Sequence, residues 1–245
     1  MLKNFYNTYW QRRLQDLDDE ELHLKDEHRF FEKFIGELKN LSILEVGCGI
    51  GSFCKRYARN NFVVGVDISI SALCHSVKKG IKAVVSDAIN LPFKTESFNA
   101  VMLKDILEHI PLPSLAVIEA KRVVKDSGNL FVWVPNIAFL ANRISLLFGR
   151  FNDYSSIDET IDIIDCEHLH FFDKYSIKKL LIYKDLKISK LDYVPISSSL
   201  FKRGIKRLLG RKTIFTVPLY LLYRTGYFLS KSLFGLYIVL TAHKK

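Results

Sequence analysis

The sequence predicts an α/β fold, a doubly wound sheet of seven strands, and three observations lead to this prediction. Short apolar runs alternate with helical patterns along the chain, a glycine-rich turn follows the first run, and a carboxylate ends the second. Continuous apolar strands that alternate with helices are typical of a parallel sheet covered on both faces, with ligands at the carboxyl ends of its strands. With 245 residues, 49% of them hydrophobic, the chain is long enough for such a sheet with additions.

The expected elements follow in chain order. Residues 10–38 have a helical pattern, whose apolar stripe consists of Phe30, Phe31, Phe34, Ile35 and Leu38. Strands are expected near residues 42–46, 62–66, 82–86, 98–103 and 129–134, and helices near 52–60, 70–79 and 114–125. A helix that carries Ile177, Leu180 and Leu181 and strands near 187–194 and 236–242 complete the pattern.

The glycine-rich turn has the form G-x-G-x-G, at Gly47, Gly49 and Gly51. A phosphate loop is excluded because no Gly-Lys-Ser/Thr follows, and a dinucleotide loop is disfavoured because its G-x-G-x-x-G spacing is missing. Glu45 precedes the turn, and Asp67 follows Gly51 by sixteen residues. Two carboxylates favour a positively charged nucleoside whose ribose hydroxyls need an acceptor, and S-adenosyl-L-methionine has these properties.

Three further segments follow the turn in order: residues 86–93 read SDAINLPF, residues 96–101 read ESFNAV and residues 105–110 read DILEHI. With the turn, they resemble the motifs of the class I S-adenosylmethionine-dependent methyltransferases. The resemblance is to the type 11 and type 23 group, which includes ubiquinone-biosynthesis-like and surface-glycan-associated members. It covers residues 40–140 and implies a Rossmann-like sheet whose last strand is antiparallel, with S-adenosyl-L-methionine as the cofactor.

The resemblance also implies roles for single residues. The three glycines would pass under the cofactor, Asp67 would hold the ribose diol, and Asp87 with Ala88 would meet the adenine edge. The other residues expected to line this pocket are Glu45, Cys48, Ile68 and Lys104. Asn99 stands where the family usually has aspartate; that residue generally caps the start of the fourth strand, so we expect cofactor binding to be kept.

Residues 136–173 form an expected insert after the fifth strand, and its sequence bears on the acceptor. It contains GRF at residues 149–151 and DCEHLHFFD at residues 165–173. These resemble a subgroup with Gly-Arg-Phe and Asp-x-x-His-x-Arg-Phe-Phe-Thr, common among methyltransferases associated with surface glycans and lipid-linked sugars. His170 and Asp173 replace the arginine and threonine of that pattern. The resemblance implies that the insert covers the acceptor pocket.

Histidines are the candidate general bases because imidazole titrates near neutral pH, and a general base contributes about 10²- to 10⁴-fold in rate. His168 is the first candidate, His109 the second and His170 the third; for each, a packing or loop-bonding role is an open alternative. The four cysteines, at positions 48, 54, 74 and 166, form no C-x-x-C pair, so we expect no metal site and a reducing compartment. No signal-peptide pattern opens the sequence, which predicts a cytoplasmic location.

The charge of +10 comes from the C-terminal part of the sequence. Residues 1–192 hold equal numbers of basic and acidic residues, whereas residues 193–245 hold ten basic residues and no acidic one. Basic and apolar side chains alternate around a helix over residues 201–209, which predicts a segment that lies on an anionic membrane surface through residues 200–231. The apolar runs are too short to span a bilayer. An alternative that stays open is that the apolar face of this helix packs on the sheet and its basic face is only solvated. A nucleic-acid-binding surface is disfavoured because Leu, Ile and Phe are abundant in this region.

We therefore expect one methyltransferase domain over residues 1–245. Its expected parts are a helical cap at 1–40, a cofactor-binding core at 41–135, an acceptor-side insert at 136–173 and a basic amphipathic segment at 196–233. The expected activity is O-methylation of a glycan, lipid-linked sugar or polyprenyl-type acceptor at the cytoplasmic membrane face. Two alternatives stay open: a methyltransferase for a quinone ring or another small molecule, and a cofactor-binding scaffold without turnover.

Overall fold

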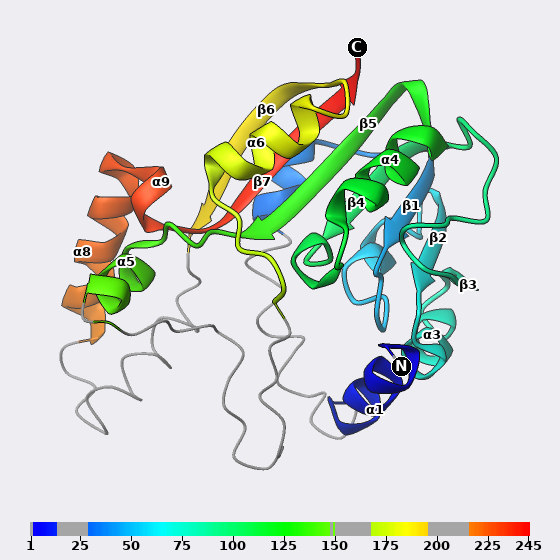
Figure 1. The fold of residues 1–245 in the computed structure, drawn as a ribbon, viewed down its shortest axis with the longest axis horizontal. Coiled ribbons are helices and arrows are strands. Elements are labelled where there is room, and N and C mark those ends of the chain that lie inside the picture. The colour runs from blue at the N-terminus through cyan, green and yellow to red at the C-terminus, as the bar shows by residue number, and fades with distance from the viewer. Residues whose placement is uncertain (1, 14–28, 148, 150–167, 196–215) are drawn as a thin grey trace.

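The computed structural model describes residues 2–13, 29–147, 149, 168–195 and 216–245. A seven-stranded sheet runs through the middle of the molecule (Figure 1). Its strands are β1 (Ser42–Val46), β2 (Phe62–Asp67), β3 (Lys82–Val85), β4 (Phe98–Lys104), β5 (Val124–Pro135), β6 (Leu186–Pro195) and β7 (Gly235–Lys244). Their order is β3-β2-β1-β4-β5-β7-β6.

The first five strands are parallel, and β7 is antiparallel to both of its neighbours, β5 and β6. The chain starts in the middle of the sheet at β1, moves outward to β3 and then returns to β4 on the other side of β1. The carboxyl ends of β1 and β4 are therefore neighbours at the point where the strand order reverses, which is where open α/β sheets bind ligands. This arrangement confirms the predicted doubly wound fold with its antiparallel last strand.

Helices join the strands and cover the sheet. They are α1 (Leu2–Arg13), η2 (Cys54–Arg56), α3 (Ile70–Val77), η3 (Leu107–His109), α4 (Pro113–Val123), α5 (Leu140–Leu147), α6 (Lys174–Ile182), α8 (Thr216–Leu229) and α9 (Lys231–Phe234); residues 29–35 are also helical. Local side chains fix two helix starts: Ser69 accepts a hydrogen bond from the backbone N of Ala72, and Asp173 forms a capping box with Ser176.

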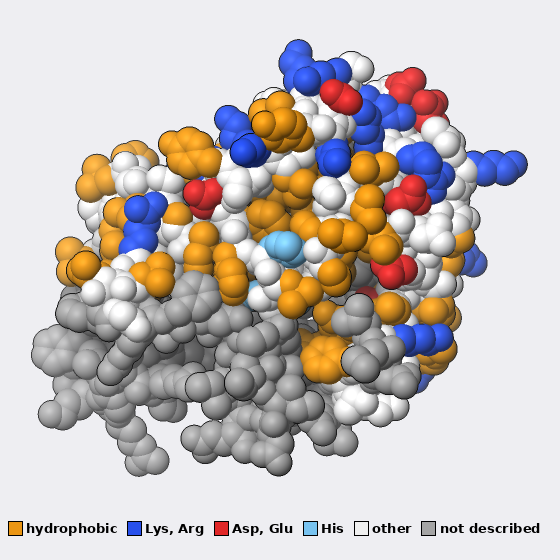
Figure 2. All heavy atoms as spheres, in the orientation of Figure 1, with side chains coloured by type: hydrophobic (Ala, Val, Ile, Leu, Met, Phe, Trp, Pro, Cys, Tyr) orange, Lys and Arg blue, Asp and Glu red, His pale blue; other side chains and the backbone are white. Residues whose placement is uncertain are grey.

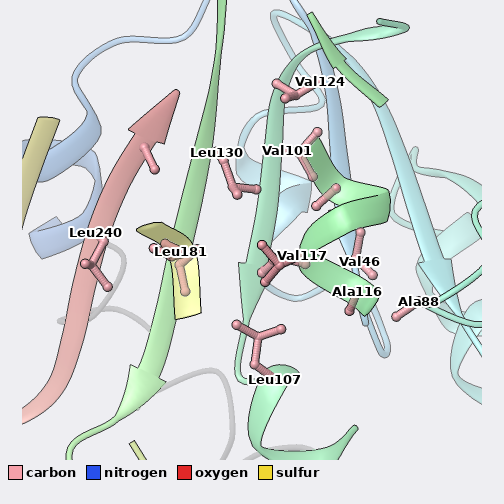
Figure 3. Packing of buried hydrophobic residues seen from close by; sticks show 14 of the residues in the cluster. Val46, Ala88, Val101, Leu107, Ala116, Val117, Val124, Leu130, Leu181 and Leu240 are labelled. Atoms are coloured by element: carbon pink, nitrogen blue, oxygen red, sulfur yellow. The ribbon is translucent and has the colours of Figure 1, made fainter. Parts of the chain in front are cut away.

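Alternate residues of each central strand enter two separate cores, because side chains of a strand point to opposite faces. On β5, Val132 and Val134 belong to the core beneath α4 and α6, whereas Phe131 and Trp133 pack on the other face against Phe31. Figure 3 shows the first core, in which Val117 of α4 lies among strand residues. Because both faces of the sheet are packed, chemistry is left to its edges and strand ends.

Three expected elements differ from the structure, and a fourth lies outside the described residues. The helix expected over residues 10–38 begins at Leu2 and ends at Arg13, and a second helical stretch covers residues 29–35; residues 14–28 lie outside the described part. The helix expected at 52–60 is only the short turn η2, because Tyr57, Ala58 and Asn60 donate backbone hydrogen bonds three residues back. Strand β5 begins at Val124 and not at residue 129. The expected amphipathic helix over residues 201–209 lies outside the described residues.

Candidate cofactor and acceptor site

The glycine-rich turn connects β1 to η2 and lies against the end of β2. The backbone N atoms of Gly47 and Cys48 donate hydrogen bonds of 2.8 and 2.9 Å to the carbonyl of Val66. Gly47 and Gly49 have φ values of +73° and +51°, which side-chain-bearing residues rarely adopt. A Cβ on Gly47 would lie 2.6 Å from Cδ1 of Ile106, so the turn also packs closely on the segment after β4.

Asp67 ends β2 beside this turn and is held by two backbone donors. Its Oδ2 accepts a 2.8 Å hydrogen bond from Gly49 N, and its Oδ1 accepts one of the same length from Ser69 N. Desolvation raises the pKa of Asp67 above its usual value, and the backbone donors act against this rise. Each carboxylate oxygen can accept a second hydrogen bond, so Asp67 still has capacity for a ribose diol.

The remaining expected pocket residues surround the same strand ends. Asp87 is exposed and accepts a 3.2 Å bond from Ile89 N, Ala88 is buried, and Ile68 is half-buried beside Asp67. Together, the three glycines of the turn, the small Ala88 and the spare acceptors of Asp67 fit a nucleoside that carries a positive charge. Cys48 is buried in the turn.

Glu45 and Lys104 lie deeper in the sheet than the glycine-rich turn. Glu45 is 3% exposed, its Oε2 makes no hydrogen bond within the described parts of the chain, and burial raises its pKa from 4.5 to about 7. Lys104 pairs with Asp105 and lies over the rings of Phe53 and Trp133, at 5.6 and 5.1 Å from their centroids. The packed rings hold Lys104 beside Glu45, where its charge lowers the carboxyl pKa in part.

Helix α1 covers the glycine-rich turn; the sequence analysis expected a helical cap at residues 1–40 but did not predict this contact with the turn. The indole of Trp10 lies so close to Gly49 that a Cβ there would be 2.5 Å from Cζ2. Asn7 Oδ1 accepts hydrogen bonds from the hydroxyls of Ser69 and Ser71, at 2.9 and 3.1 Å, and so ties α1 to the start of α3. The aromatic residues near the N-terminus were the available signal for a helix with a packing partner.

A second group of polar side chains lies after β4. Glu108, His109 and His168 place one nitrogen or oxygen atom each within 4.8 Å of the others. The imidazole centroids of His109 and His168 are 4.9 Å apart, and His109 Nε2 lies 3.9 Å from Glu108 Oε1. Figure 2 shows histidine among hydrophobic side chains on one face of the molecule. The structure thus brings together two of the three candidate bases with a carboxylate that the sequence analysis did not single out.

His170 does not belong to this cluster. The Nε2 atom of His170 donates a 3.1 Å hydrogen bond to the carbonyl of Pro111. The backbone N atoms of Leu169 and His170 both donate to the carbonyl of Glu108, at 2.7 and 3.1 Å. These bonds attach residues 168–170 to η3. The two ends of the expected insert lie side by side, because Asn136 forms an isolated β-bridge with Phe172.

Asn99 lies at the opposite end of the sheet from the cofactor residues. Its Oδ1 accepts hydrogen bonds from the backbone N and the hydroxyl of Ser42, at 3.0 and 2.8 Å, and so joins the beginnings of β1 and β4. An acceptor oxygen is all that these contacts require, which explains why an amide can replace the carboxylate here.

Comparison with known proteins gives the same result as the fold. A family model described as "Methyltransferase domain" matches residues 44–132. An uncharacterized protein of Methanocaldococcus jannaschii is 30% identical over 131 residues, which are 54% of this chain and 61% of the relative. The mitochondrial ubiquinone biosynthesis O-methyltransferase of Candida albicans is 30% identical over 123 residues, 45% of this chain and 37% of that protein. The chain spans about three fifths of the first two curated relatives it matches.

Solved structures share the fold at low sequence identity. The magnesium protoporphyrin IX methyltransferase of Synechocystis, which contains S-adenosylhomocysteine, aligns with a TM-score of 0.64 at 13% identity and covers 100% of this chain and 98% of its own. A possible histamine N-methyltransferase of Thermotoga maritima aligns with a TM-score of 0.62 at 18% identity, over 99% of this chain and 97% of its own. The strand order and the antiparallel β7 give the chain the fold of the class I S-adenosylmethionine-dependent methyltransferases, and residues 44–132 are similar to their methyltransferase domain.

Proposed function

We propose that the chain O-methylates a hydroxyl-bearing acceptor that is lipid-linked or a glycan, at a membrane surface. The observation that supports this most is the position of the Glu108, His109 and His168 cluster beside the cofactor side of the sheet. Ile106, two residues before Glu108, packs on Gly47, so the acceptor-side cluster and the glycine-rich turn share one wall. Methylation of a hydroxyl needs a group that accepts its proton or weakens its O–H bond, and this cluster is placed to supply such a group.

On the cofactor side, S-adenosylmethionine supplies a methyl group on a positively charged sulfur. Asp67 would accept hydrogen bonds from the ribose hydroxyls, and the glycines would allow close approach of the backbone. Asp87 and Ala88 would border the adenine. The carboxylate charge of Asp67 and the small side chains favour the cationic cofactor over a nucleotide with phosphates.

Helix α8 supports the membrane part of the proposal. Leu221, Leu222, Phe228 and Leu229 expose 60, 68, 87 and 79% of their surface. Arg224 lies on the same helix and Lys231 begins the next, within a C-terminal region that has no acidic residue. Large apolar side chains next to basic ones are typical of helices that lie in a lipid interface. Among the described residues, no helix has both the length and the apolar character needed to cross a membrane.

The quinone or small-molecule alternative also has support. Besides the Candida albicans protein, the 27-O-demethylrifamycin SV methyltransferase of Amycolatopsis mediterranei is 29% identical over 156 residues, 56% of this chain and 55% of that protein. Both names describe methylation in the chemistry of a small molecule, and both specify an oxygen. A small hydroxylated ring is therefore the second candidate acceptor.

Mass spectrometry of cells with and without the gene separates these acceptors. We expect a mass increase of one methylene unit in a lipid-linked or surface-glycan fraction that depends on the gene. The same increase in the quinone fraction instead would favour the alternative, and no change in any fraction would contradict an active enzyme.

The membrane part has its own test. Binding of the full chain to anionic vesicles is expected to weaken when Phe228 and Leu229 are both changed to serine. Phe62→Ser is the matched control, because Phe62 is 56% exposed at the start of β2. Equal binding by the two variants would refute a docking role of α8.

A further inference from the structure

The cluster after β4 combines donor groups from two segments that are distant in sequence. Glu108 and His109 belong to η3, while His168 precedes α6 by six residues. The backbone bonds from Leu169 and His170 to the carbonyl of Glu108 fix these segments against each other. One ligand atom from each of the three side chains lies within 4.8 Å of the other two. The juxtaposition is therefore maintained by main-chain contacts and does not depend on the side chains themselves.

Glu108 is the unusual member of the cluster. It is 1% exposed, and neither of its carboxylate oxygens has a hydrogen-bond partner in the part of the chain that the structure describes. The 3.9 Å separation from His109 Nε2 is too long for a hydrogen bond. Buried carboxylates without partners are strongly unfavourable, so such a group in a folded protein indicates a bound cation or proton.

The charges nearby favour a cation. The carboxylate of Asp105 adds negative charge close to Glu108, and Lys104 makes its ion pair with Asp105. Asp105 Oδ1 is also buried without a hydrogen-bond partner within the described residues. Two carboxylates thus share one lysine at this end of β4, which leaves one negative charge that a bound cation would offset.

We propose that Glu108, His109 and His168 bind one divalent transition-metal ion of the zinc type. Two imidazoles and one carboxylate are a donor set that suits Zn²⁺ and, with similar geometry, Co²⁺. Metal–ligand distances of about 2.0–2.2 Å place the ligand atoms of a tetrahedral site about 3.3 Å apart. The ligand atoms lie within 4.8 Å of one another here, so side-chain rotations have to shorten each separation by about 1.5 Å at most. Three protein ligands leave a fourth position open. The expectation of no metal site rested on the spacing of the cysteines alone, whereas this site consists of two histidines and a glutamate.

The ion gives the cluster a defined role, and this role rests on the proposed O-methylation. An acceptor hydroxyl in the open position becomes more acidic, because a bound divalent ion stabilises the deprotonated oxygen. Its proton leaves to solvent, the oxygen forms the bond to the methyl carbon, and the carbon–sulfur bond breaks with its electron pair on sulfur. His109 and His168 then serve as ligands, and no histidine has to act as a free base.

Metal binding is measured directly on the full chain. After removal of metals with a chelator, the protein is dialysed against zinc, and bound zinc is measured by plasma mass spectrometry; cobalt is used in parallel for its visible absorption. We expect about one equivalent of zinc and the intense cobalt bands of a four-coordinate site. Glu108→Gln and His168→Ala should weaken binding at least about tenfold, as loss of a ligand or its support does.

His75→Ala is the matched control, since His75 is a half-buried histidine on α3 whose Nδ1 lies 3.1 Å from the carbonyl oxygen of Ser71. It should keep the full equivalent of zinc. Circular dichroism of each variant checks that it folds, and Glu108→Gln preserves side-chain shape. Binding of less than a tenth of an equivalent by the unchanged protein, or full binding by both ligand variants, would overturn the proposal.

Failure of the metal site and failure of the proposed function give different results. Calorimetry with S-adenosylmethionine and methyl transfer by chelated protein are measured beside zinc binding. Full transfer without metal would overturn the metal's role while leaving the methyltransferase function intact. Stoichiometric zinc that is lost in the ligand variants supports the site even where no acceptor is turned over.

Discussion

Gly49→Ala tests how the glycine-rich turn depends on its missing side chain. The φ of Gly49 is +51°, and this left-handed backbone costs a residue with a Cβ about 1–2 kcal/mol. A Cβ would also lie 2.5 Å from Cζ2 and 2.9 Å from Cη2 of Trp10. The indole must therefore move, and α1 is expected to lose its contact with the turn.

Gly80→Ala separates backbone strain from this collision. Gly80 has a φ of +80°, and a Cβ on it would meet no atom within 4 Å. In urea unfolding, the Gly80 variant should lose about 1–2 kcal/mol and keep its affinity for S-adenosylmethionine. Gly49→Ala should lose at least as much stability and bind the cofactor about tenfold more weakly or worse, a difference of about 1.4 kcal/mol, because the new Cβ occupies the cradle.

Tryptophan fluorescence reports the movement of α1 directly. The chain has two tryptophans, and Trp133 is buried in the sheet core, so a spectral change in Gly49→Ala would come from Trp10. Calorimetry supplies the cofactor affinity of each variant. If Gly49→Ala matches Gly80→Ala in unfolding free energy, fluorescence and cofactor affinity, the packing of Trp10 on the turn has no part in cofactor binding and the reasoning is wrong.

Further predictions concern stability. Burial raises the pKa of Glu45 from 4.5 to about 7, so the folded state holds this proton more strongly than the unfolded state. The unfolding free energy should therefore fall by roughly 3 kcal/mol as pH rises from 4.5 to about 7. In urea titrations, Glu45→Gln should reduce this dependence of the unfolding free energy on pH, and an unchanged dependence would contradict the prediction. Asn99→Ala should cost about 1–3 kcal/mol because the backbone N of Ser42 loses its acceptor and the Ser42 hydroxyl keeps only the carbonyl of Ser97. Asn99→Asp should keep stability, and equal losses in thermal melts would refute this. Lys231→Ala breaks an exposed pair with Asp192 and should change the unfolding free energy by less than about 1 kcal/mol, a limit that urea titration checks.

The sequence predicted the sheet well because each strand has a local signal. Strand β1 has the predicted limits, and β2 and β4 extend one residue beyond theirs. These runs are short, continuous and bounded by glycine or charged residues, so their pattern does not depend on distant contacts. The antiparallel β7 came from the family resemblance, since a single strand's pattern carries no direction.

The differences arise where distant contacts decide the structure. Residues 52–60 have a helical pattern, but Asn61 donates side-chain hydrogen bonds to the carbonyls of Leu38 and Tyr57 and ends the turn early. The cover that α1 provides depends on Asn7 meeting the serines of α3, more than sixty residues later. Neither contact leaves a periodic signal in its own segment.

The candidate site shows the same division between local and distant information. Asp67 and the glycines follow from spacing, and their roles remain predictions. Glu108 could not be selected from sequence, because its importance lies in its burial without a hydrogen-bond partner within the described residues and in the approach of His168 from a segment sixty residues away. A glutamate beside a histidine is common in helical turns, and only the fold shows that this one is enclosed.

The packing of Ile106 on Gly47 gives the two halves of the site a common physical dependence. Ile106 immediately precedes η3, which carries Glu108 and His109 of the proposed metal cluster, and the Ile106 side chain fills the space that a Cβ on Gly47 would need. Displacement of the turn therefore also displaces η3, and the backbone bonds from Leu169 and His170 to Glu108 carry that movement into the insert. Because packed interiors transmit small shifts, cofactor binding and the geometry of the acceptor cluster are not independent in this chain. A defect in methyl transfer can consequently be assigned to the acceptor cluster only when cofactor affinity is measured on the same variant.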